Sequence, residues 1–462
     1  MPWIFYPDGR IIPTNMKSIT VVGAGLAGSE AAWQIARAGF FVNLFEMRPM
    51  HTTGAHVSGE FAELVCSNSL GSNLRNKPSG LLKQELKLLG SLLIDCAEQA
   101  ALPAGSALAV DRDSFARKVT DILSNHPNIK IHREEVTEVP SGPAIIASGP
   151  LTSESLSKSI QQYTGHDNLF FYDAISPTIE VSSINMEIAF KASRYKFDQE
   201  EIGDYINCPL NEEEYKTFIS ELMTAKTIGI RDFENQMTDG VKTSFFEACL
   251  PIEILAKRNP LSLAFGPMRP VGIHNPHTEE KPRAVVQLRQ ENLSATEFNM
   301  VGFQTNLTYS EQARVFRKIP GLDNAKFTRY GQMHRNTYIN SPTCMKPTLQ
   351  TKTLPDLFFA GQIAGIEGYV GNIASGLVAG LNAVRFLKGE SLLIFPPETM
   401  HGALHASICR EDNKYFQPIK ANFGLLPPIP QLPQSKPERG FIYSNRALKR
   451  LQEFIEENGI NN

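Results

Sequence analysis

Two glycine-rich segments, more than 300 residues apart, constrain the fold of this chain more than any other feature. The first directly follows the β-branched run 19–22 and reads Gly23-Ala24-Gly25-Leu26-Ala27-Gly28. The second extends from Gly361 to Gly380, again after an apolar run. A glycine turn between a buried strand and a helix is typical of dinucleotide-binding α/β folds. The two segments therefore predict one such fold assembled from opposite ends of the sequence.

The three glycines of the first segment have different expected roles. Gly23 allows the tight turn, Gly25 lets the backbone approach a pyrophosphate, and Gly28 lets helix and strand pack closely. A helix predicted over residues 29–38 would direct its N-terminal N–H groups and its positive dipole end at the phosphates. We therefore expect residues 23–28 to bind the pyrophosphate of a cofactor.

The acidic residue Glu46 strengthens this motif. It follows a second predicted strand, 41–45, and lies 18 residues beyond Gly28, where a carboxylate would accept a hydrogen bond from a ribose hydroxyl. A carboxylate at this point disfavours a 2′-phosphate, so the site suits FAD or NAD. The acid alone does not separate these two cofactors.

The second glycine segment favours FAD. A strand predicted at 357–360 leads into a turn at Gly361 and Gln362, and a helix is predicted to begin near Ser375. This late strand-turn-helix unit resembles the flavin-contacting element of FAD enzymes. A further predicted strand, 144–147, resembles their midchain return to the cofactor domain. The alternative interpretation is that these small residues only allow helices to pack together.

The fold class expected from this order is α/β: a Rossmann-like FAD-binding domain of the glutathione-reductase type, with an inserted α+β domain. Residues 201–257 are charged and helix-like, whereas residues 261–340 carry strand-like runs broken by glycine and proline. The expected parts are an N-terminal extension (1–15, with Met16 as an alternative start), the first part of the FAD-binding domain (16–180), an insertion or substrate domain (181–339), the second part of the FAD-binding domain (340–395), and a C-terminal tail with a candidate RNA contact (396–462).

Composition limits the remaining function classes. The chain has 462 residues, of which 42% are hydrophobic and 20% charged, as in soluble globular proteins of two or three domains. No apolar run reaches 18 residues, so we expect no membrane span. The six cysteines form no C-x-x-C pair, which argues against a metal site and for reduced thiols in a cytoplasm.

The net charge of −3 does not favour nucleic-acid binding, but basic residues gather locally. Aromatic side chains among basic ones suit unstacked bases and phosphates, whereas the alternative is an ordinary solvated surface. The first cluster contains Arg314, Arg317, Lys318, Lys326, Arg329 and Arg335 with Phe316, Phe327 and Tyr330, and the second contains Lys436, Arg439, Arg446, Lys449 and Arg450.

Two cysteines lie in polar, irregular contexts and are candidate functional thiols. Cys66 is part of E-L-V-C-S-N-S, and Cys249 is part of F-F-E-A-C-L-P-I-E. The alternative for each is a small buried hydrophobic residue, which is what most free cysteines are.

Ten segments together resemble one family, the folate- and FAD-dependent tRNA (uracil-5-)-methyltransferases of bacteria. The resemblance covers residues 16–390, with small departures such as Ala248, where the family usually has glycine. The segments are V-V-G-A-G-L-A-G-S-E-A-A (21–32), E-M-R-P (46–49), F-A-E-L-V-C-S-N-S-L (61–70), P-A-G-S-A-L-A-V-D-R (103–112), F-Y-D-A (171–174), C-L-P-I-E (249–253), F-G-P-M-R-P-V-G (265–272), G-F-Q-T-N-L (302–307), M-H-R-N-T-Y-I-N-S-P (333–342) and A-G-Q-I-A-G-I-E-G-Y-V (360–370).

The resemblance implies a reaction. Methylenetetrahydrofolate (5,10-methylenetetrahydrofolate) would give a one-carbon unit to C5 of the T-loop uridine, position 54, in the T-arm of tRNA, forming 5-methyluridine. Reduced FAD would convert that unit to a methyl group, and NADH or NADPH would reduce the flavin again.

The resemblance also implies roles for single residues. Cys249 would be the thiolate that adds to C6 of uracil, because C5 is a poor nucleophile until such an addition occurs. Cys66 would be a second functional cysteine beside the flavin. Tyr369 and Asn340 are further site candidates by motif only. His334 and Arg335 would contact folate or RNA, or else form structural hydrogen bonds.

Other activities remain open from the sequence. A related flavoprotein that modifies the wobble uridine of tRNA would need a much longer chain with a large helical C-terminal part. A small-molecule FAD oxidoreductase would need a C-x-x-C pair or a second dinucleotide fold, and neither is evident. A non-catalytic RNA-binding flavoprotein and an enzyme that acts on ribosomal RNA are the remaining alternatives.

Overall fold

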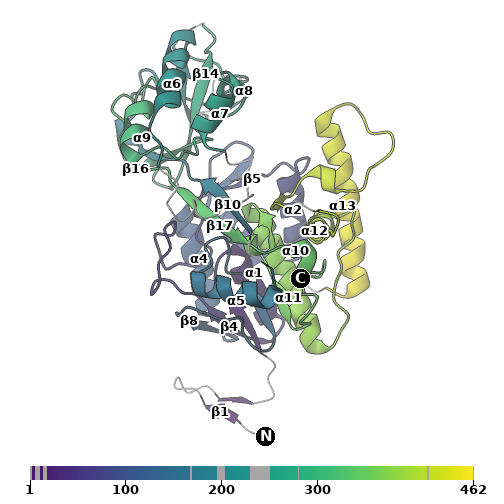
Figure 1. The fold of residues 1–462 in the computed structure, drawn as a ribbon. Helices are drawn as coiled ribbons and strands as arrows, with labels where there is room; N and C mark the ends of the chain where they lie inside the picture. The colour runs from purple at the N-terminus through teal and green to yellow at the C-terminus, as the bar shows by residue number, and fades with distance from the viewer. Residues whose placement is uncertain are drawn as a thin grey trace.

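The computed structural model describes residues 3–5, 11–13, 18–166, 169–194, 203–228, 250–278, 280–413 and 416–460. Figure 1 shows a larger lobe, built from the first and last parts of the chain, and a smaller lobe above it, built from the middle. Cys249 lies outside the described residues, as do the rest of residues 229–249.

A five-stranded parallel sheet forms the centre of the larger lobe. Its strand β3 is β-branched and buried, and it runs directly into Gly23. The strand order is β18 (Leu357–Phe359), β9 (Ala144–Ile146), β3 (Ser18–Val22), β4 (Phe41–Phe45) and β8 (Ile129–His132). The late strand β18 thus pairs with β9, as the prediction of one fold from opposite chain ends requires. The predicted α/β, Rossmann-like class is confirmed.

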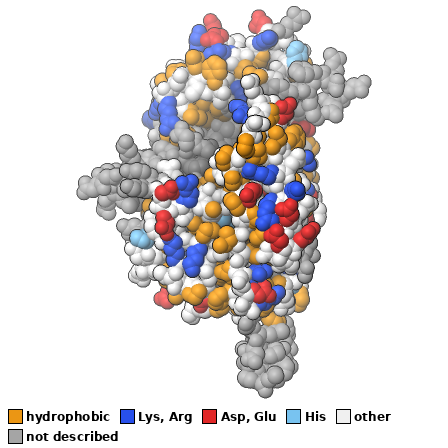
Figure 2. Space-filling model, turned by 90° about the vertical axis from the view of Figure 1, so that its right-hand side faces the viewer, with side chains coloured by type: hydrophobic (Ala, Val, Ile, Leu, Met, Phe, Trp, Pro, Cys, Tyr) orange, Lys and Arg blue, Asp and Glu red, His pale blue; other side chains and the backbone are white. Residues whose placement is uncertain are grey.

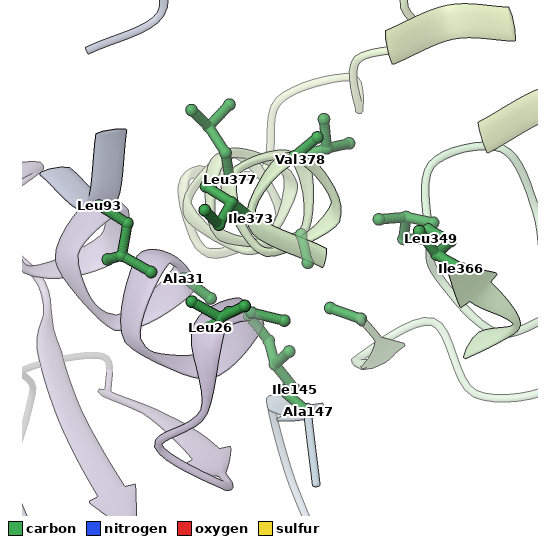
Figure 3. Close-up of a cluster of buried hydrophobic side chains, with 14 of the residues drawn as sticks. Leu26, Ala31, Leu93, Ile145, Ala147, Leu349, Ile366, Ile373, Leu377 and Val378 are labelled. Atoms are coloured by element: carbon green, nitrogen blue, oxygen red, sulfur yellow. The ribbon is translucent and has the colours of Figure 1, made fainter. Parts of the chain in front are cut away.

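Two helices pack against each other over this sheet, namely α1 (Leu26–Arg37) and the glycine-rich α11 (Tyr369–Lys388). A Cβ at Gly376 would lie 2.2 Å from the carbonyl oxygen of Ala27. Figure 3 shows side chains from both helices meeting those of β9 in one apolar cluster; the labelled members include Leu26, Ala31, Ile145, Ala147, Ile373 and Leu377. The helix-packing interpretation of the late glycines is therefore correct for part of the segment.

The start predicted for the late helix near Ser375 is wrong, because α11 begins at Tyr369. Gly371 lies inside the helix, where a Cβ would be 2.9 Å from Ile366, so this glycine serves close packing and not a turn. By length and composition this helix could cross a membrane, but 83% of its most apolar 18-residue stretch is buried inside the protein.

An antiparallel six-stranded sheet forms the smaller lobe, and Phe218, Phe303 and Phe316 lie in its core. Its order is β12 (Phe190–Ala192), β13 (Tyr205–Leu210), β14 (Ala284–Gln290), β15 (Glu297–Met300), β11 (Thr178–Glu180) and β16 (Phe327–Arg329). The helices of this lobe are α6 (Glu212–Thr224), α7 (Ile252–Arg258), α8 (Ser262–Phe265) and α9 (Tyr309–Phe316). Strand β13 corrects the helix-like interpretation of residues 201–257: its apolar side chains are buried in the sheet, which charge content alone did not reveal.

The segment expected as a C-terminal tail, 396–462, contributes α12 (Met400–Ile408) and α13 (Lys436–Asn458) to the larger lobe. Both contact α2 (Pro78–Leu88), and Figure 1 shows the long α13 beside α12 and α2. The remaining elements of the larger lobe are β5 (Ser69–Ser72), α3 (Leu92–Gln99), β6 (Ala101–Leu102), β7 (Ala107–Val110), α4 (Arg112–Ser124), α5 (Glu154–Thr164), α10 (Ser341–Cys344), β19 (Ile366–Glu367) and β20 (Ile419–Lys420).

Two further strand pairs complete the description. Strands β10 (Leu169–Ala174) and β17 (Met333–Tyr338) pair antiparallel, and Figure 1 shows them between the two lobes. Near the N-terminus, β1 (Trp3–Phe5) and β2 (Ile11–Pro13) pair with each other, away from the rest of the larger lobe in Figure 1.

Candidate cofactor and catalytic site

The glycine turn after β3 has the geometry that its sequence predicts. Gly23 has a φ of +94°, and a Cβ there would lie 2.6 Å from the carbonyl oxygen of Ala147. A Cβ at Gly28 would lie 1.7 Å from the carbonyl oxygen of Gly23, whereas a Cβ at Gly25 would meet no atom within 4 Å. Gly23 and Gly28 thus serve the fold, and Gly25 borders open space. That a cofactor fills this space stays a prediction.

The space beside Gly25 is a cavity at the carboxyl ends of the parallel strands. Leu26 and Ala27, in the first turn of α1, line it together with Gly23 and Gly25. Gly25 is the N-cap of α1 and supplies no side-chain hydrogen bond to the helix. An uncapped helix N-terminus at a cavity favours an anionic ligand such as a pyrophosphate.

Glu46 lines the same cavity but is already strongly paired. Its carboxylate accepts hydrogen bonds from the backbone N–H of Ala24 at 3.1 Å and from the guanidinium Nε of Arg48 at 2.9 Å. Burial favours the neutral acid, yet the hydrogen bonds and charge of Arg48 together lower the pKa of Glu46 below its ordinary value. Glu46 is therefore ionised at neutral pH, and its pair with the buried Arg48 fixes its orientation.

The late glycine segment completes this cavity. Gly361, Gln362 and Tyr369 line it from the C-terminal side, as does Asn372. Gly361 has a φ of +82°, which suits glycine, and its backbone N–H donates to Ser375 Oγ at 2.8 Å. Among the described residues, the buried Oδ1 of Asn372 has no hydrogen-bond partner, so it is available to a ligand.

A second cavity of about 440 Å³ adjoins the first, and Gln362, Tyr369 and Asn372 line both. Cys66 lines this second cavity. Burial raises the pKa of the Cys66 thiol, so the thiol is protonated at neutral pH unless a ligand or a nearby charge alters its surroundings. The arrangement thus places a thiol next to the expected cofactor site.

Tyr369 connects the cofactor cavity to Cys66. Its hydroxyl oxygen accepts hydrogen bonds from the backbone N–H of Cys66 at 2.8 Å and of Ser67 at 3.0 Å. Burial raises the pKa of Tyr369, so the phenol stays neutral. The structure therefore gives Tyr369 a role in holding the cysteine loop, in addition to its position beside the expected cofactor.

Of the candidates in the segment 333–342, only His334 lines either cavity. Burial, with the charge of Arg329, lowers the pKa of His334 to about 4, so the ring is neutral. The guanidinium of Arg335 lies 3.6 Å from the ring centroid of Phe170. Asn340 is the N-cap of α10, and its carbonyl oxygen accepts from the Cys344 thiol at 3.3 Å.

Cys249 is outside the described residues, but Glu253, four residues later in the same C-L-P-I-E segment, is described. The buried carboxylate of Glu253 accepts hydrogen bonds from Thr305 Oγ1 at 2.9 Å and from the backbone N–H of Asn306 at 2.7 Å. Residues of the C-L-P-I-E segment and of the G-F-Q-T-N-L segment are thus in direct contact in the smaller lobe.

The first basic cluster is largely engaged in structural contacts. Arg314 forms ion pairs with Glu221 and Glu311, and Arg317 donates to the carbonyl oxygen of Ala325. Phe316 is fully buried. In the second cluster, on α13, Arg450 pairs with Glu457. The solvated or structural interpretation therefore applies to these side chains, and RNA contact by the other members of the clusters stays a prediction.

Residues that sequence reasoning missed include Arg48 and Asn372, and also Glu367, which lines the second cavity. Burial, with the charge of Asp173, raises the pKa of Glu367 to about 8. Arg48 and Glu367 are inside the segments E-M-R-P and A-G-Q-I-A-G-I-E-G-Y-V. Their place in family-like segments was a usable signal, but no spacing rule pointed to them.

Comparisons with known proteins agree with this architecture. Residues 18–391 match the family model described as "Glucose inhibited division protein A". The methylenetetrahydrofolate--tRNA-(uracil-5-)-methyltransferase TrmFO of Bacillus subtilis (strain 168) is 50% identical over 438 residues, or 95% of this chain and 98% of that protein. The protein of the same name from Enterococcus faecalis (strain ATCC 700802 / V583) is 51% identical over 440 residues, or 95% of this chain and 99% of that protein.

A solved structure supports the fold independently. The structure of Aquifex aeolicus GidA (form II crystal) superposes with a TM-score of 0.69 at 18% identity. The match covers 96% of this chain and 74% of that one. At this identity the likeness concerns the fold alone.

Proposed function

The chain belongs to the family of methylenetetrahydrofolate--tRNA-(uracil-5-)-methyltransferases, and on this basis we propose that it methylates C5 of a uridine in tRNA with a one-carbon unit from methylenetetrahydrofolate. The observation that carries the proposal, beside family membership, is the pair of joined cavities. One has the form of a dinucleotide site, and the other contains the thiol of Cys66.

FAD is the cofactor that fits the first cavity. Gly25 leaves room for a pyrophosphate, the ionised Glu46 suits a ribose hydroxyl, and the unpartnered Oδ1 of Asn372 offers an acceptor. When bound, FAD supplies the reducing equivalents that turn a methylene unit into a methyl group. NADH or NADPH is the proposed source of those equivalents.

The protein's thiols carry the other half of the proposed chemistry. Uracil C5 becomes nucleophilic only after a nucleophile has added to C6, and Cys249 is the residue that we assign to this addition. Cys66 lines the second cavity, next to Val65, which lines both cavities, and is the proposed second functional thiol.

The substrate is proposed to be the T-loop uridine at position 54 in the T-arm of tRNA, and the product 5-methyluridine, in the cytoplasm. On the face drawn in Figure 2, basic and acidic side chains are interspersed over the larger lobe. Recognition of tRNA on that face would therefore depend on shape and on single contacts more than on a broad basic field.

Incorporation of a labelled methylene group tests the proposal. Undermethylated tRNA should gain label from methylenetetrahydrofolate with the wild-type protein, and none when the folate is omitted or replaced by S-adenosylmethionine. Cys249→Ala and Cys249→Ser should retain FAD but lose methylation, because a hydroxyl is a far weaker nucleophile at neutral pH. Cys66→Ala should also lose turnover.

Two outcomes would contradict parts of this assignment. Undiminished methylation by the Cys249→Ala variant would remove its role as nucleophile. Label in ribosomal RNA, with none in tRNA, would replace the substrate while leaving the chemistry in place.

A further inference from the structure

The loop that carries Cys66 is held by arginine side chains. We call residues 64–68 the cysteine loop. Arg112, at the start of α4, donates from Nη1 to the carbonyl oxygen of Leu64 at 2.7 Å. Arg329, on β16 of the smaller lobe, donates from Nη2 to the carbonyl oxygen of Val65 at 2.7 Å. The two carbonyls directly before Cys66 are therefore each fixed by a guanidinium.

The other end of the cysteine loop is also tied to the smaller lobe. Arg289, on β14, donates from Nε to Oδ1 of the buried Asn68 at 2.7 Å. The amide of Asn68 in turn donates to the carbonyl oxygen of Gln290 at 2.8 Å. A loop of the larger lobe is thus held on both sides of its cysteine by strands of the smaller one.

The three arginines differ in how their charge is balanced. Arg112 forms an ion pair with Glu291 at 2.8 Å. In the part of the chain that the structure describes, neither Arg289 nor Arg329 has a carboxylate oxygen within the 4 Å of an ion pair. Arg289 is buried and Arg329 is partly buried, and the charge of Glu291 acts on both of them without a direct ion pair. Their charges are therefore balanced less directly than the charge of Arg112, and they can act on other groups nearby.

One group on which the charge of both arginines acts is the thiol of Cys66. A positive charge near a thiol stabilises the thiolate and opposes the effect of burial. Among the residues that the structure describes, the titratable and charged groups that act on Cys66 or line its cavity are Asp173, Glu367, Arg112, Arg289, Arg329, Tyr369, His334 and Lys420, and Glu291 acts on the three arginines. Asp173 and Glu367 act against the thiolate, whereas Arg112 and Arg329 favour it.

We propose that Arg329 is a positioning residue for Cys66: from the smaller lobe it fixes the cysteine loop through Val65 and, together with Arg112, supplies positive charge that favours the thiolate. Arg289 supports the same loop through Asn68. The importance of this role for catalysis rests on the proposed function, but the geometry of the loop does not. The basic residue Arg329, which the sequence offered as part of an RNA-contact cluster, thereby acts inside the protein.

The test is the rate at which Cys66 is alkylated by iodoacetamide in the FAD-loaded protein, from pH 7 to 9.5. Mass spectrometry of the peptide that contains Cys66 separates it from the other cysteines. The Arg329→Gln variant should react about five- to tenfold more slowly at each pH, because loss of a nearby positive charge raises a thiol pKa by up to about one pH unit. Arg329→Lys, which retains the charge, should recover at least half of the rate on a logarithmic scale.

Arg317→Gln is the matched control, since Arg317 also donates to a backbone carbonyl, but to that of Ala325 within the smaller lobe. It should leave the alkylation profile unchanged. The methylation kcat of Arg329→Gln should fall at least tenfold with little change in the KM for tRNA. A role in RNA binding would instead raise KM.

Wild-type alkylation rates in both Arg329 variants would overturn the proposal. If Arg329→Gln does not fold, the Lys variant still decides: its alkylation rate should fall by no more than about threefold, and a fall of about five- to tenfold, as expected for a full loss of charge, would contradict the assigned role. Alkylation of Cys66 does not require methyl transfer. If the wild-type protein showed no methylation activity, the proposed function would be rejected, but the alkylation rates would still test the role of Arg329.

Discussion

At the scale of single residues, Gly25 and Gly28 illustrate how one motif serves two purposes. The Cβ position of Gly25 is empty, and its φ of −71° is allowed for any residue. The Cβ position of Gly28 overlaps the carbonyl oxygen of Gly23 at 1.7 Å. A side chain at Gly25 would therefore compete with a ligand, whereas a side chain at Gly28 would compete with the fold.

The two substitutions should consequently fail in different ways. Gly25→Val should give a folded protein that melts cooperatively but is colourless, because its side chain occupies the space of the pyrophosphate. Gly28→Ala should lower the melting temperature markedly or prevent soluble expression, because backbone must move to admit the methyl group. Flavin absorbance and thermal melting measure both effects. A yellow Gly25→Val protein with full occupancy would show that the cofactor lies elsewhere.

Residues named by a motif were easier to predict than residues recruited by the fold. The spacing after Gly28 pointed to Glu46, and the structure places that carboxylate in the first cavity. Arg48 and Arg329 carry no such spacing signal. Arg48 pairs with the nearby Glu46, but its contact with Glu63 and the contact of Arg329 with Val65 are made only after folding. Local sequence therefore indicated the kind of site, while the supporting side chains required tertiary structure.

At the scale of elements, a buried carboxylate joins α2 to α12 across 315 residues of sequence. Glu85 accepts hydrogen bonds from the backbone N–H of Met400 at 2.7 Å and from His401, both its backbone N–H at 3.0 Å and its ring Nδ1 at 2.7 Å. The carboxylate thus satisfies free N–H groups at the N-terminus of α12 and complements its dipole.

Removing this carboxylate should destabilise the protein without touching the active site. We expect Glu85→Ala to lower the free energy of unfolding by about 2–4 kcal/mol, because buried donors lose their acceptor. Glu154→Ala is the control, since the exposed Glu154 pairs with Lys158 on the surface of α5 and its loss should not change the melting temperature. Equal melting temperatures for the two variants would contradict the structural role of Glu85.

Element prediction succeeded where periodicity and glycine turns coincided. The strands β3, β4, β9, β14 and β18 lie where runs of apolar residues indicated them. The start of α11 and the strand β13 were missed, because glycines inside a buried helix look like a turn and a short strand next to a charged helix looks like its continuation. In both cases, tertiary packing outweighed local preference.

At the scale of the whole molecule, we propose that residues 16–180 and 340–395 form one cofactor domain and that 181–339 form the domain that meets the substrate. The sheet of the smaller lobe supports this division, although its strand β11 already begins at Thr178. The contacts of Arg289 and Arg329 with the cysteine loop mean that the two domains share one site. Composition suggested two or three domains, but the shared site follows only from their contact.

The two ends of the chain should respond oppositely to truncation. Removal of residues 396–462 takes away Met400, Leu404, Ile408 and Leu451, which are all fully buried in the core of the larger lobe. Burial of four such side chains contributes about 6–12 kcal/mol, which is close to the whole stability of a typical domain at about 5–15 kcal/mol. This variant should be insoluble or lack FAD.

A protein that starts at Met16 should instead bind FAD and methylate normally, because the described strands β1 and β2 pair only with each other. Flavin content, melting temperature and methyl incorporation distinguish the two results, and a folded, yellow protein ending at residue 395 would contradict the structural role of α12 and α13.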